Sequence, residues 1–293
     1  MAHKAGFVNI IGSPNVGKST LMNVLVGERL SIITSKAQTT RHRIMGIVNG
    51  EDFQIVYSDT PGVLKPNYKL QESMMEFVHT ALTDADVILF VTDIYEDIKI
   101  EEKILNKIKN AGAKVLLLIN KIDLATQEKL EEKVACWKNE VPNSEVIPVS
   151  ALEKFNVNYI FDRILACLPE GPGFYDKDQL TDKPEKFFVS EIIREKILTN
   201  YKKEIPYSVE VIVESFKDEE KIIKIRAEII VVRDSQKGII IGHQGKALKK
   251  VGTEARKDIE GFFGKQVFLE LFVKVNKDWR DSDTQLKRFG YLS

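Results

Sequence analysis

The segment GSPNVGKS, residues 12–19, combines two glycines with a lysine and a hydroxyl side chain at a spacing that suits a phosphate. The glycines let main-chain N–H groups turn inward around phosphate oxygens without a side-chain clash. In such a loop Lys18 neutralises the β and γ oxygens, and the Ser19 hydroxyl binds Mg²⁺. Because the same spacing also occurs by chance in glycine-containing turns, the assignment depends on whether the rest of a nucleotide site follows.

DTPG, residues 59–62, is the next such motif, and it follows the apolar run FQIVY. We expect the Asp59 carboxylate to reach Mg²⁺ through water and the Gly62 N–H to meet the γ-phosphate. By itself the motif is also a plausible ordinary turn, since Asp, Pro and Gly all favour turns. Val63 comes next and cannot hydrogen-bond a water, so this loop lacks the side chain that often orients the attacking water.

A preference for guanine over adenine is indicated by NKID, residues 120–123, at the end of the run KVLLLI. The Asp123 carboxylate can accept hydrogen bonds from both the ring N–H and the exocyclic amino group of guanine. Adenine offers neither donor at that edge, so a buried Asp123 would be left unpaired and an ATPase is disfavoured. In SAL, residues 150–152, the Ala151 N–H is expected to meet the guanine carbonyl.

The polar segment SKAQTTRHR, residues 35–43, lies between the phosphate loop and DTPG. A threonine in it would close over Mg²⁺ when the γ-phosphate is present. Thr40 is our choice for that ligand and Thr39 the alternative, while a solvated loop without a role is the third possibility. Ser19, Thr40 and, through water, Asp59 are thus the predicted Mg²⁺ site. The predicted GTP contacts are Gly12, Ser13, Asn15, Val16, Gly17, Lys18, Ser19, Thr20, Asp59, Thr60, Pro61, Gly62, Asn120, Lys121, Asp123, Ser150, Ala151 and Leu152.

Short apolar runs alternate with amphipathic stretches through the first half of the chain. Runs such as VILFV do not alternate with polar residues, which is typical of a mostly parallel, doubly wound sheet covered by helices on both faces. The second and third runs are separated by only a few residues around Gly50, so an antiparallel hairpin is expected there. Strands are predicted at 7–11, 44–48, 53–57, 87–91, 114–119 and 145–149, and helices at 18–26, 70–82, 99–110, 127–139 and 156–168.

The order of elements changes after a segment rich in proline and glycine. Three of the nine prolines lie within residues 168–184. We therefore assign residues 169–185 as a linker between a first domain, 1–168, and a second domain, 186–293. The second domain has predicted helices at 187–200 and around a break near residue 242, and predicted strands at 208–216, 221–232 and 267–275.

GHQG, residues 242–245, interrupts an apolar run and opens a helix within a basic stretch. Two glycines three apart let a nucleic-acid backbone approach closely, and the helix N-terminus faces its phosphates. Helix–GxxG–helix beside strands is typical of a KH domain, which clamps about four single-stranded nucleotides. A solvated basic helix–turn–helix is the alternative. The predicted RNA contacts are Arg233, Gln236, Lys237, Gly242, His243, Gln244, Gly245, Lys246, Lys249 and Lys250.

Four phenylalanines near the end of the chain are expected in the core rather than as base-stacking platforms, because their neighbours alternate as in a packed strand. They are Phe262, Phe263, Phe268 and Phe272.

Composition and charge narrow the class of protein. A chain of 293 residues, 43% hydrophobic and 29% charged, can form two domains with sizeable cores. No apolar run approaches the ~20 residues of a membrane span, and no apolar signal segment precedes the first strand, so a cytoplasmic location is expected. Residues 181–293 hold 23 Lys or Arg against 19 acids, whereas residues 1–180 hold 20 against 24, which favours a polyanionic partner for the second half.

The motifs already quoted, followed by SEIIREK (190–196), RDSQKGIIIGHQG (233–245), EARKDIE (254–260) and LFVKVNKDWR (271–280), resemble those of the Era family of bacterial GTPases over essentially the whole chain. The resemblance implies an α/β P-loop GTPase domain with a mixed, mostly parallel, doubly wound sheet, followed by an α+β type II KH domain. It implies a monomeric switch that uses GTP/GDP and Mg²⁺ and assists assembly of the 30S subunit. The implied partner is the 3′ end of small-subunit (16S) ribosomal RNA, with peripheral association with the inner membrane as a further family trait.

The resemblance also bears on the missing water-orienting side chain. Era-type GTPases have a hydrophobic residue at the position of Val63, and relatives carry an Asn in the phosphate loop, here Asn15, that helps hold K⁺ between the phosphates. K⁺ there would stabilise charge on the β–γ bridge. The predicted catalytic residues are therefore Lys18, Asn15 and Thr40, and no general base is assigned.

One departure from the family concerns the KH loop. Family members often have a basic residue between the two glycines, where His243 and Gln244 stand here. Gln244 can only hydrogen-bond, and His243 is mostly neutral at pH 7, so Lys237 and Lys246 are expected to supply the phosphate contact. The alternative function is a signalling GTPase whose C-terminal domain binds a protein effector or a membrane, in which RNA affinity would not depend on the loop glycines.

Overall fold

The computed structural model describes residues 2–96 and 102–292, which form two compact units. The first unit contains most of residues 1–182. The second contains residues 183–293 together with two short segments from the first half of the chain, Thr34–Thr39 and Tyr68–Leu70. These two segments therefore pack with the second unit although the sequence places them within the first.

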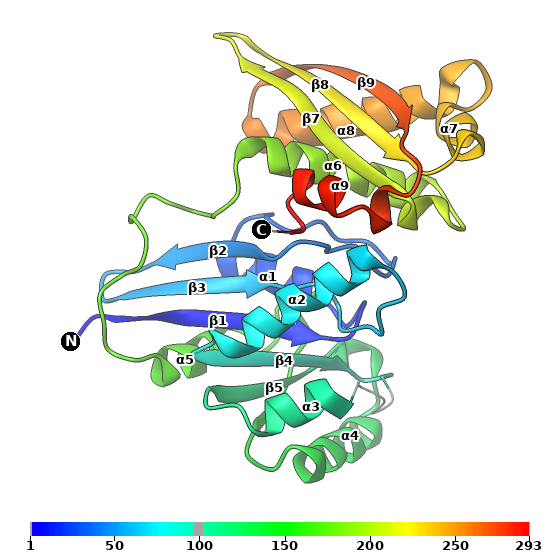
Figure 1. Cartoon of the computed structure of the whole chain (residues 1–293). Helices are drawn as coiled ribbons and strands as arrows, with labels where there is room; N and C mark the ends of the chain where they lie inside the picture. Colours follow the sequence, from blue (N-terminus) through cyan, green and yellow to red (C-terminus); the bar gives the residue numbers. More distant parts are fainter. Residues whose placement is uncertain (1, 97–101, 293) are drawn as a thin grey trace. The chain divides into compact units, whose positions relative to one another are not determined.

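The first unit is a six-stranded sheet flanked by helices (Figure 1). Its elements are β1 (Lys4–Gly12), α1 (Lys18–Val26), β2 (Ile44–Asn49), β3 (Phe53–Asp59), α2 (Lys69–Thr83), β4 (Val87–Asp93), α3 (Glu102–Lys109), β5 (Lys114–Asn120), α4 (Gln127–Glu140), β6 (Glu145–Pro148) and α5 (Val157–Cys167). The strand order is β2-β3-β1-β4-β5-β6. Only the β2–β3 pair is antiparallel, so the expected hairpin is confirmed.

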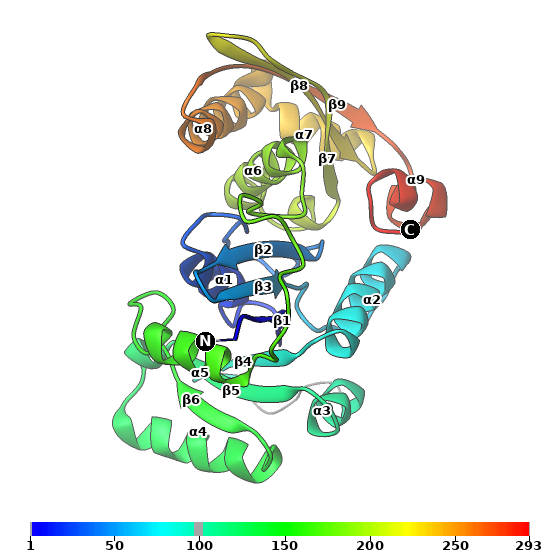
Figure 2. The same cartoon turned by 90° about the vertical axis from the view of Figure 1, so that its left-hand side faces the viewer.

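Helices cover both faces of this sheet, with α2 and α3 on one side and α1 and α5 on the other (Figure 2). Every residue of β4 is buried, which is why its sequence shows no polar alternation. Because β1, β3, β4, β5 and β6 are parallel, their carboxyl ends meet at one edge of the sheet. The loops that follow β1, β3, β5 and β6 carry the four nucleotide motifs.

The segment expected to be a linker runs along the first unit. The Ile47 N–H donates to the Leu180 carbonyl at 2.8 Å, and the Thr181 hydroxyl donates to the Met45 carbonyl at 2.7 Å. Main-chain groups of the edge strand β2 are thereby paired, as exposed strand edges generally need. We name residues 170–182 the strap, because they are bound along the unit that precedes them.

The second unit is a three-stranded sheet with helices packed on one face (Figure 1). Its elements are α6 (Glu185–Asn200), β7 (Val209–Asp218), β8 (Ile222–Val231), α7 (Asp234–Ile241), α8 (Lys246–Phe263), β9 (Gln266–Val275) and α9 (Asp283–Arg288). Strand β8 is central, antiparallel to β7 and parallel to β9. Isoleucine and valine side chains from α6, α8 and the inner sheet face form its core.

Three of the four phenylalanines predicted for that core are exposed, so the prediction is wrong for them. Phe268 is 52% exposed and Phe272 39%, because they share the face of β9 that no helix covers. Phe262 is 39% exposed near the end of α8, whereas Phe263 packs against the core as predicted.

Two further differences from the sequence expectations concern helices. The predicted helix at 99–110 lies partly outside the described residues, and its described part is α3. Helix α9 was not predicted; it is short, and its buried Leu286 is held by tertiary packing. In the part of the chain that the structure describes, no helix is both long and apolar enough to cross a membrane.

Candidate functional site

The phosphate loop connects β1 to α1, and Gly17 at its end has a φ of 98°. A Cβ atom there would lie 2.2 Å from Asn120 Nδ2, so only glycine fits this position. Helix α1 begins at the next residue, Lys18, whose Nζ donates to the Ser13 carbonyl at 2.8 Å. The loop thus wraps around its own lysine at a helix N-terminus, which is an arrangement suited to anionic oxygens.

The Lys18 ammonium is buried inside this loop. Burial lowers the pKa of Lys18 from 10.5 to about 8, although the nearby Asp59 and Glu96 carboxylates act in the opposite direction. A cation held with too little compensating charge is stabilised by an anion that binds beside it. The electrostatics therefore favour a phosphate at this position.

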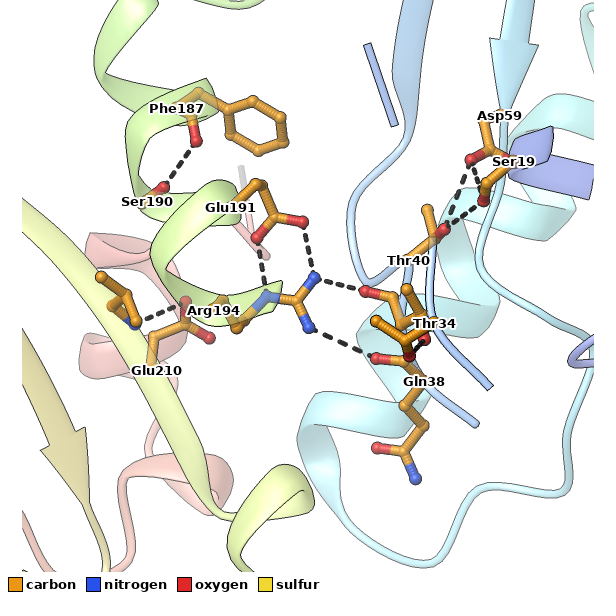
Figure 3. A network of polar contacts seen from close by, with 12 residues as sticks. Ser19, Thr34, Gln38, Thr40, Asp59, Phe187, Ser190, Glu191, Arg194 and Glu210 are labelled. Atoms are coloured by element: carbon orange, nitrogen blue, oxygen red, sulfur yellow. Dashed lines mark hydrogen bonds and ion pairs between the residues drawn. The ribbon is translucent and has the colours of Figure 1, made fainter. Parts of the chain in front are cut away.

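Three oxygen-bearing side chains from three segments converge next to the loop (Figure 3). Ser19 Oγ donates to Asp59 Oδ2 at 2.7 Å and lies 2.9 Å from Thr40 Oγ1. Thr40 Oγ1 donates to the same carboxylate oxygen at 3.3 Å. The other oxygen, Asp59 Oδ1, is buried and has no hydrogen-bond partner within the described residues.

This donor set fits Mg²⁺, which prefers oxygen ligands from few protein groups. Burial raises the pKa of Asp59, and the adjacent Lys18 and Ser19 oppose that rise by favouring the carboxylate. A divalent cation would favour the carboxylate further. Of the two threonines considered, it is Thr40 that lies with Ser19 and Asp59, because the Thr39 hydroxyl is 2.6 Å from Thr34 Oγ1 and donates to the Lys36 carbonyl at 2.6 Å.

Asn120 ties three of the predicted motifs together. Its Nδ2 donates to the Val16 carbonyl at 2.8 Å, and its Oδ1 accepts from the Ala151 N–H at 3.0 Å. Lys121 follows in the left-handed region, with a φ of 61°, and its Nζ donates to the Asn15 carbonyl at 2.6 Å. The ends of β1, β5 and β6 are thereby linked by hydrogen bonds.

The base-recognition carboxylate lies beside this link. Asp123 Oδ1 accepts from the Ser150 hydroxyl at 2.6 Å, which orients the carboxylate. Asp123 and Leu152 are exposed, so the buried environment expected for Asp123 is not present in the protein alone. The carboxylate would become buried only when a base binds over it. Guanine would then pair with it, whereas adenine would leave it unpaired.

The remaining predicted nucleotide contacts differ in how they face the site. The Thr60 hydroxyl donates to the Ile10 carbonyl at 2.7 Å and is buried, so only main-chain groups of Thr60 can face a nucleotide. Gly62 approaches the phosphate loop, since a Cβ atom there would lie 2.8 Å from Pro14. Val63 is buried, and its N–H donates to the Gly12 carbonyl at 3.1 Å. Ser13, Val16 and Pro61 lie in the same two loops, whereas Thr20 lies in the first turn of α1.

In the second unit, the GHQG loop joins α7 to α8. Gly242 and Gly245 have φ values of 69° and 74°, and a Cβ atom on Gly242 would lie 2.6 Å from the Ala247 Cβ. His243 and Gln244 between them are exposed. Lys246, Lys249 and Lys250 are exposed along the start of α8.

Gln236, also predicted as an RNA contact, does not belong with these exposed residues, because its side chain is buried and bonded to the main chain. Its side chain is 5% exposed, and its Oε1 accepts from the N–H groups of Val232 and Arg233 at 3.0 and 3.1 Å. The carboxamide therefore caps the start of α7, where main-chain N–H groups lack helical partners. Arg233 itself is exposed.

A groove of about 360 Å³ begins at this loop and is lined by residues that the sequence motifs do not include. Gly252 inside the predicted helix was the one sequence feature that pointed to this groove. It lets α8 approach β9, since a Cβ atom there would lie 3.3 Å from Leu271. Arg256 also borders a second hollow toward Gly264. The groove is lined by Gly245, Leu248, Lys249, Gly252, Thr253, Arg256, Leu269 and Leu271.

Comparison with known proteins agrees with this geometry. A family described as "50S ribosome-binding GTPase" matches residues 7–121, and the KH domain family matches residues 204–280. The proteins named GTPase Era from Staphylococcus haemolyticus and Staphylococcus epidermidis are each 45% identical over 292 residues, covering 99% of this chain and 98% of theirs.

The chain belongs to the Era family. It is accordingly a GTPase, with a P-loop GTPase domain and a C-terminal KH domain. The fold agrees as well, since a crystal structure of an Aquifex aeolicus Era variant bound to GDP·AlF₄⁻ matches 99% of this chain and 100% of its own with a TM-score of 0.94 at 39% identity. A crystal structure of Era in complex with MgGDPNP and nucleotides 1506–1542 of 16S ribosomal RNA matches over the same shares with a TM-score of 0.95, also at 39% identity.

Proposed function

We propose that this Era-family GTPase binds the 3′ end region of small-subunit ribosomal RNA through its KH domain and assists assembly of the 30S subunit. The Era complex with 16S nucleotides 1506–1542 supports this most directly, because the same fold extends over 99% of this chain. The description of the matching GTPase family names the 50S subunit, whereas the RNA in the Era complex is 16S ribosomal RNA of the small subunit. We choose the small-subunit RNA because the Era complex matches 99% of this chain and the family model matches only residues 7–121. The GHQG loop and the adjacent groove supply matching features in this chain.

The proposed nucleotide contacts follow from the geometry of the loops. Lys18 and the main-chain N–H groups of residues 12–19 bind the phosphates, and Ser19, Thr40 and Asp59 hold Mg²⁺. Bound there, Mg²⁺ neutralises charge that develops on the phosphate oxygens. Asp123, oriented by Ser150, pairs with guanine.

In hydrolysis, a water oxygen bonds to the γ-phosphorus while the bond from that phosphorus to the bridging oxygen breaks. The electron pair of the broken bond stays on GDP, and the protons of the water leave with the inorganic phosphate or pass to the solvent. Lys18 stabilises the negative charge that grows on the leaving GDP. Val63 cannot orient the water, because its apolar side chain is buried. We therefore propose that main-chain groups near Gly62 and Thr40 position the water.

We also propose a K⁺ ion beside Asn15, as the family resemblance implies. Asn15 is exposed and has a φ of 66°, and its carbonyl accepts a hydrogen bond from Lys121. The Asn15 side chain has no hydrogen-bond partner among the described residues, which leaves its oxygen for a ligand. A monovalent cation there would supply charge that an arginine supplies in other GTPases.

The site of action follows from this partner. We propose that the protein works in the cytoplasm, where ribosomal subunits assemble. Peripheral contact with the inner membrane stays a prediction from the family resemblance.

The test is GTP turnover by the full chain in KCl, with and without a short RNA that copies the 3′ end of small-subunit ribosomal RNA. Turnover is expected to be slow alone and stimulated by that RNA. Gly245→Asp is the matched variant, because a carboxylate in the GHQG loop repels phosphates and a Cβ atom on Gly245 would have no heavy atom within 4 Å; it should keep the basal rate and lose the stimulation. Replacing KCl by NaCl should lower both rates if K⁺ binds beside Asn15.

Two results would contradict the proposal. If the RNA neither binds nor stimulates turnover, the effector-binding or membrane-binding alternative is favoured. If Gly245→Asp responds to RNA like the parent, the RNA acts elsewhere than at the KH loop.

A further inference from the structure

Arg43 lies three residues after Thr40, directly before β2, and it is buried. Its guanidinium donates hydrogen bonds to three separate segments of the first unit. Nε donates to Ser58 Oγ at 2.6 Å, and Nη2 donates to Asn9 Oδ1 at 3.1 Å. Nη1 and Nη2 donate to the two carboxylate oxygens of Asp84 at 2.6 and 3.0 Å. The arginine therefore joins the chain just before β2 to β3, to β1 and to the residue that follows α2.

The acceptors are themselves held in place. Asn9 and Ser58 are fully buried and are neighbours across the β1–β3 pairing. Asn9 Nδ2 donates to the Ala81 carbonyl of α2 at 2.6 Å. Asp84 is more exposed, but its Oδ1 also accepts from Asn9 Nδ2, at 2.7 Å. A buried guanidinium is costly unless it is paired and hydrogen-bonded, and this cluster supplies both conditions.

Two of the proposed Mg²⁺ ligands lie on either side of Arg43. Ser58 directly precedes Asp59, whose place is fixed because β3 pairs with both β1 and β2. Thr40 has no such support from a strand, since residues 40–43 lie outside the helices and strands. At one end of this segment the Thr40 hydroxyl donates to Asp59 Oδ2 at 3.3 Å, and at the other end Arg43 bonds to Ser58. The segment is therefore held to the end of β3 at both of its own ends.

We propose that Arg43 is a positioning residue for GTP hydrolysis: by holding the end of segment 40–43 on the sheet, it keeps the Thr40 hydroxyl at the Mg²⁺ site. The proposal rests on the role proposed above for Thr40. All of the residues involved belong to the first compact unit. A fixed end of the segment limits the conformations from which Thr40 must close over Mg²⁺ when the γ-phosphate is present.

The arrangement needs arginine rather than any cation. The planar guanidinium donates from all three of its nitrogen atoms, as a bidentate pair to Asp84 and singly to Ser58 and Asn9. A lysine could keep the ion pair with Asp84, but its single nitrogen atom cannot reach all of these acceptors. Arg43→Lys therefore tests the geometry without removing the charge.

The test compares full-length variants for kcat, the Mg²⁺ concentration at half-maximal rate, and the GDP dissociation constant. Thr40→Val measures the role of the hydroxyl, and Arg43→Lys measures the role of the anchor. Arg163→Lys is the matched control, because Arg163 makes a similar bidentate pair with Glu145 in the same unit. Glu145 is the first residue of β6, so this pair lies away from the carboxyl ends of the strands, where the nucleotide motifs are.

We expect Thr40→Val to lower kcat about tenfold and Arg43→Lys to lower it about fivefold, and both should raise the Mg²⁺ requirement. GDP affinity should stay within about twofold of the parent, because without a γ-phosphate Thr40 does not close over Mg²⁺. Adding Arg43→Lys to Thr40→Val should cause no further loss, because Arg43 acts through Thr40. Arg163→Lys should match the parent in all three measurements.

Distinct results overturn the two ideas. If Thr40→Val keeps the parent kcat, the proposed role of Thr40 fails, and the inference fails with it. If Thr40→Val is impaired while Arg43→Lys is not, or if their effects add, Arg43 is not a positioning residue. An equal loss in Arg163→Lys would also refute the proposal, because kcat would then follow the stability of the unit. Should Arg43→Lys not fold by circular dichroism, Ser58→Ala replaces it by removing the acceptor of Nε alone, and a parent-like kcat or additivity with Thr40→Val would refute the proposal.

Discussion

Lys18 must be charged to bind phosphates, yet the fold buries its ammonium group, which disfavours the charge. The phosphate loop buries its ammonium before any anion is present, and burial lowers its pKa to about 8. Between pH 8 and 10.5 the unfolded chain therefore binds more protons at this residue than the folded chain, so its contribution to stability rises with pH across that window. Below pH 8 the buried charge lowers the free energy of unfolding by an amount that does not change with pH, and bound phosphates offset that loss.

The same pKa predicts proton uptake on nucleotide binding. Phosphate charge beside Lys18 raises its pKa, so at pH 8 GDP binding should take up about half a proton. GDP affinity should fall as the pH rises above about 8. Calorimetry in two buffers of different ionisation enthalpy measures the uptake.

The control is the same titration at pH 7, where Lys18 is already protonated and the uptake from it should drop to about a tenth of a proton. Equal heats in the two buffers at pH 8 would show that the Lys18 pKa does not move on binding.

At the scale of elements, the strap shows how an exposed edge of the sheet is completed. Gln54 on β3 is 2% exposed, and its Oε1 accepts from the main-chain N–H groups of Phe174 and Tyr175 at 2.6 and 3.0 Å. Its Nε2 donates to the Tyr175 carbonyl at 2.8 Å. One buried carboxamide thus satisfies three main-chain groups of a segment whose sequence resembles a free linker.

Gln54→Leu should release this segment. Leaving main-chain groups unpaired costs about 1–3 kcal/mol, so the strap should open more often and trypsin should cleave after the exposed Lys177 roughly tenfold faster. Mass spectrometry of timed digests follows that cleavage. Gln127→Leu is the control, because Gln127 is exposed and, among the described residues, its side chain bonds to Glu131 alone. An unchanged rate in Gln54→Leu would mean that the strap is held by other contacts.

The whole chain has a net charge of zero, but residues 1–180 are negatively charged and residues 181–293 are positively charged. Residues 181–293 carry an excess of four positive charges, and the GHQG loop and α8 bear several of them on exposed side chains. An RNA partner neutralised by these residues releases counterions on binding. The affinity for RNA should therefore fall steeply as the salt concentration rises. Binding of a protein partner to the same surface need not show this dependence.

The logarithm of RNA affinity should fall linearly with the logarithm of salt concentration, with a slope of about −0.7 for each phosphate contacted. Lys249→Met should reduce the slope by about 0.7 and weaken binding to all RNA sequences similarly. Fluorescence anisotropy at several KCl concentrations measures both. Lys177→Met lies outside the KH-containing unit and serves as the control; a slope that Lys249→Met leaves unchanged would place the RNA elsewhere.

The sequence alone determined the elements and the order of the nucleotide motifs. Strands and helices of the first unit match their predicted ranges within a few residues, because apolar runs and amphipathic periods are local properties. The four motifs were recognisable for the same reason, since each is a short loop with its own turn chemistry. The antiparallel hairpin at β2 and β3 also followed from the few residues between the two runs.

Which side chains meet depends on the three-dimensional fold. Thr40 rather than Thr39 lies at Asp59, Gln236 caps a helix, and Phe268 faces outward, because each outcome depends on partners distant in sequence or on which sheet face is covered. The membership of Thr34–Thr39 in the second unit is the clearest case. Its bond to Arg194 spans more than 150 positions of the chain, and no local pattern encodes a contact made by main-chain carbonyls, which every residue possesses.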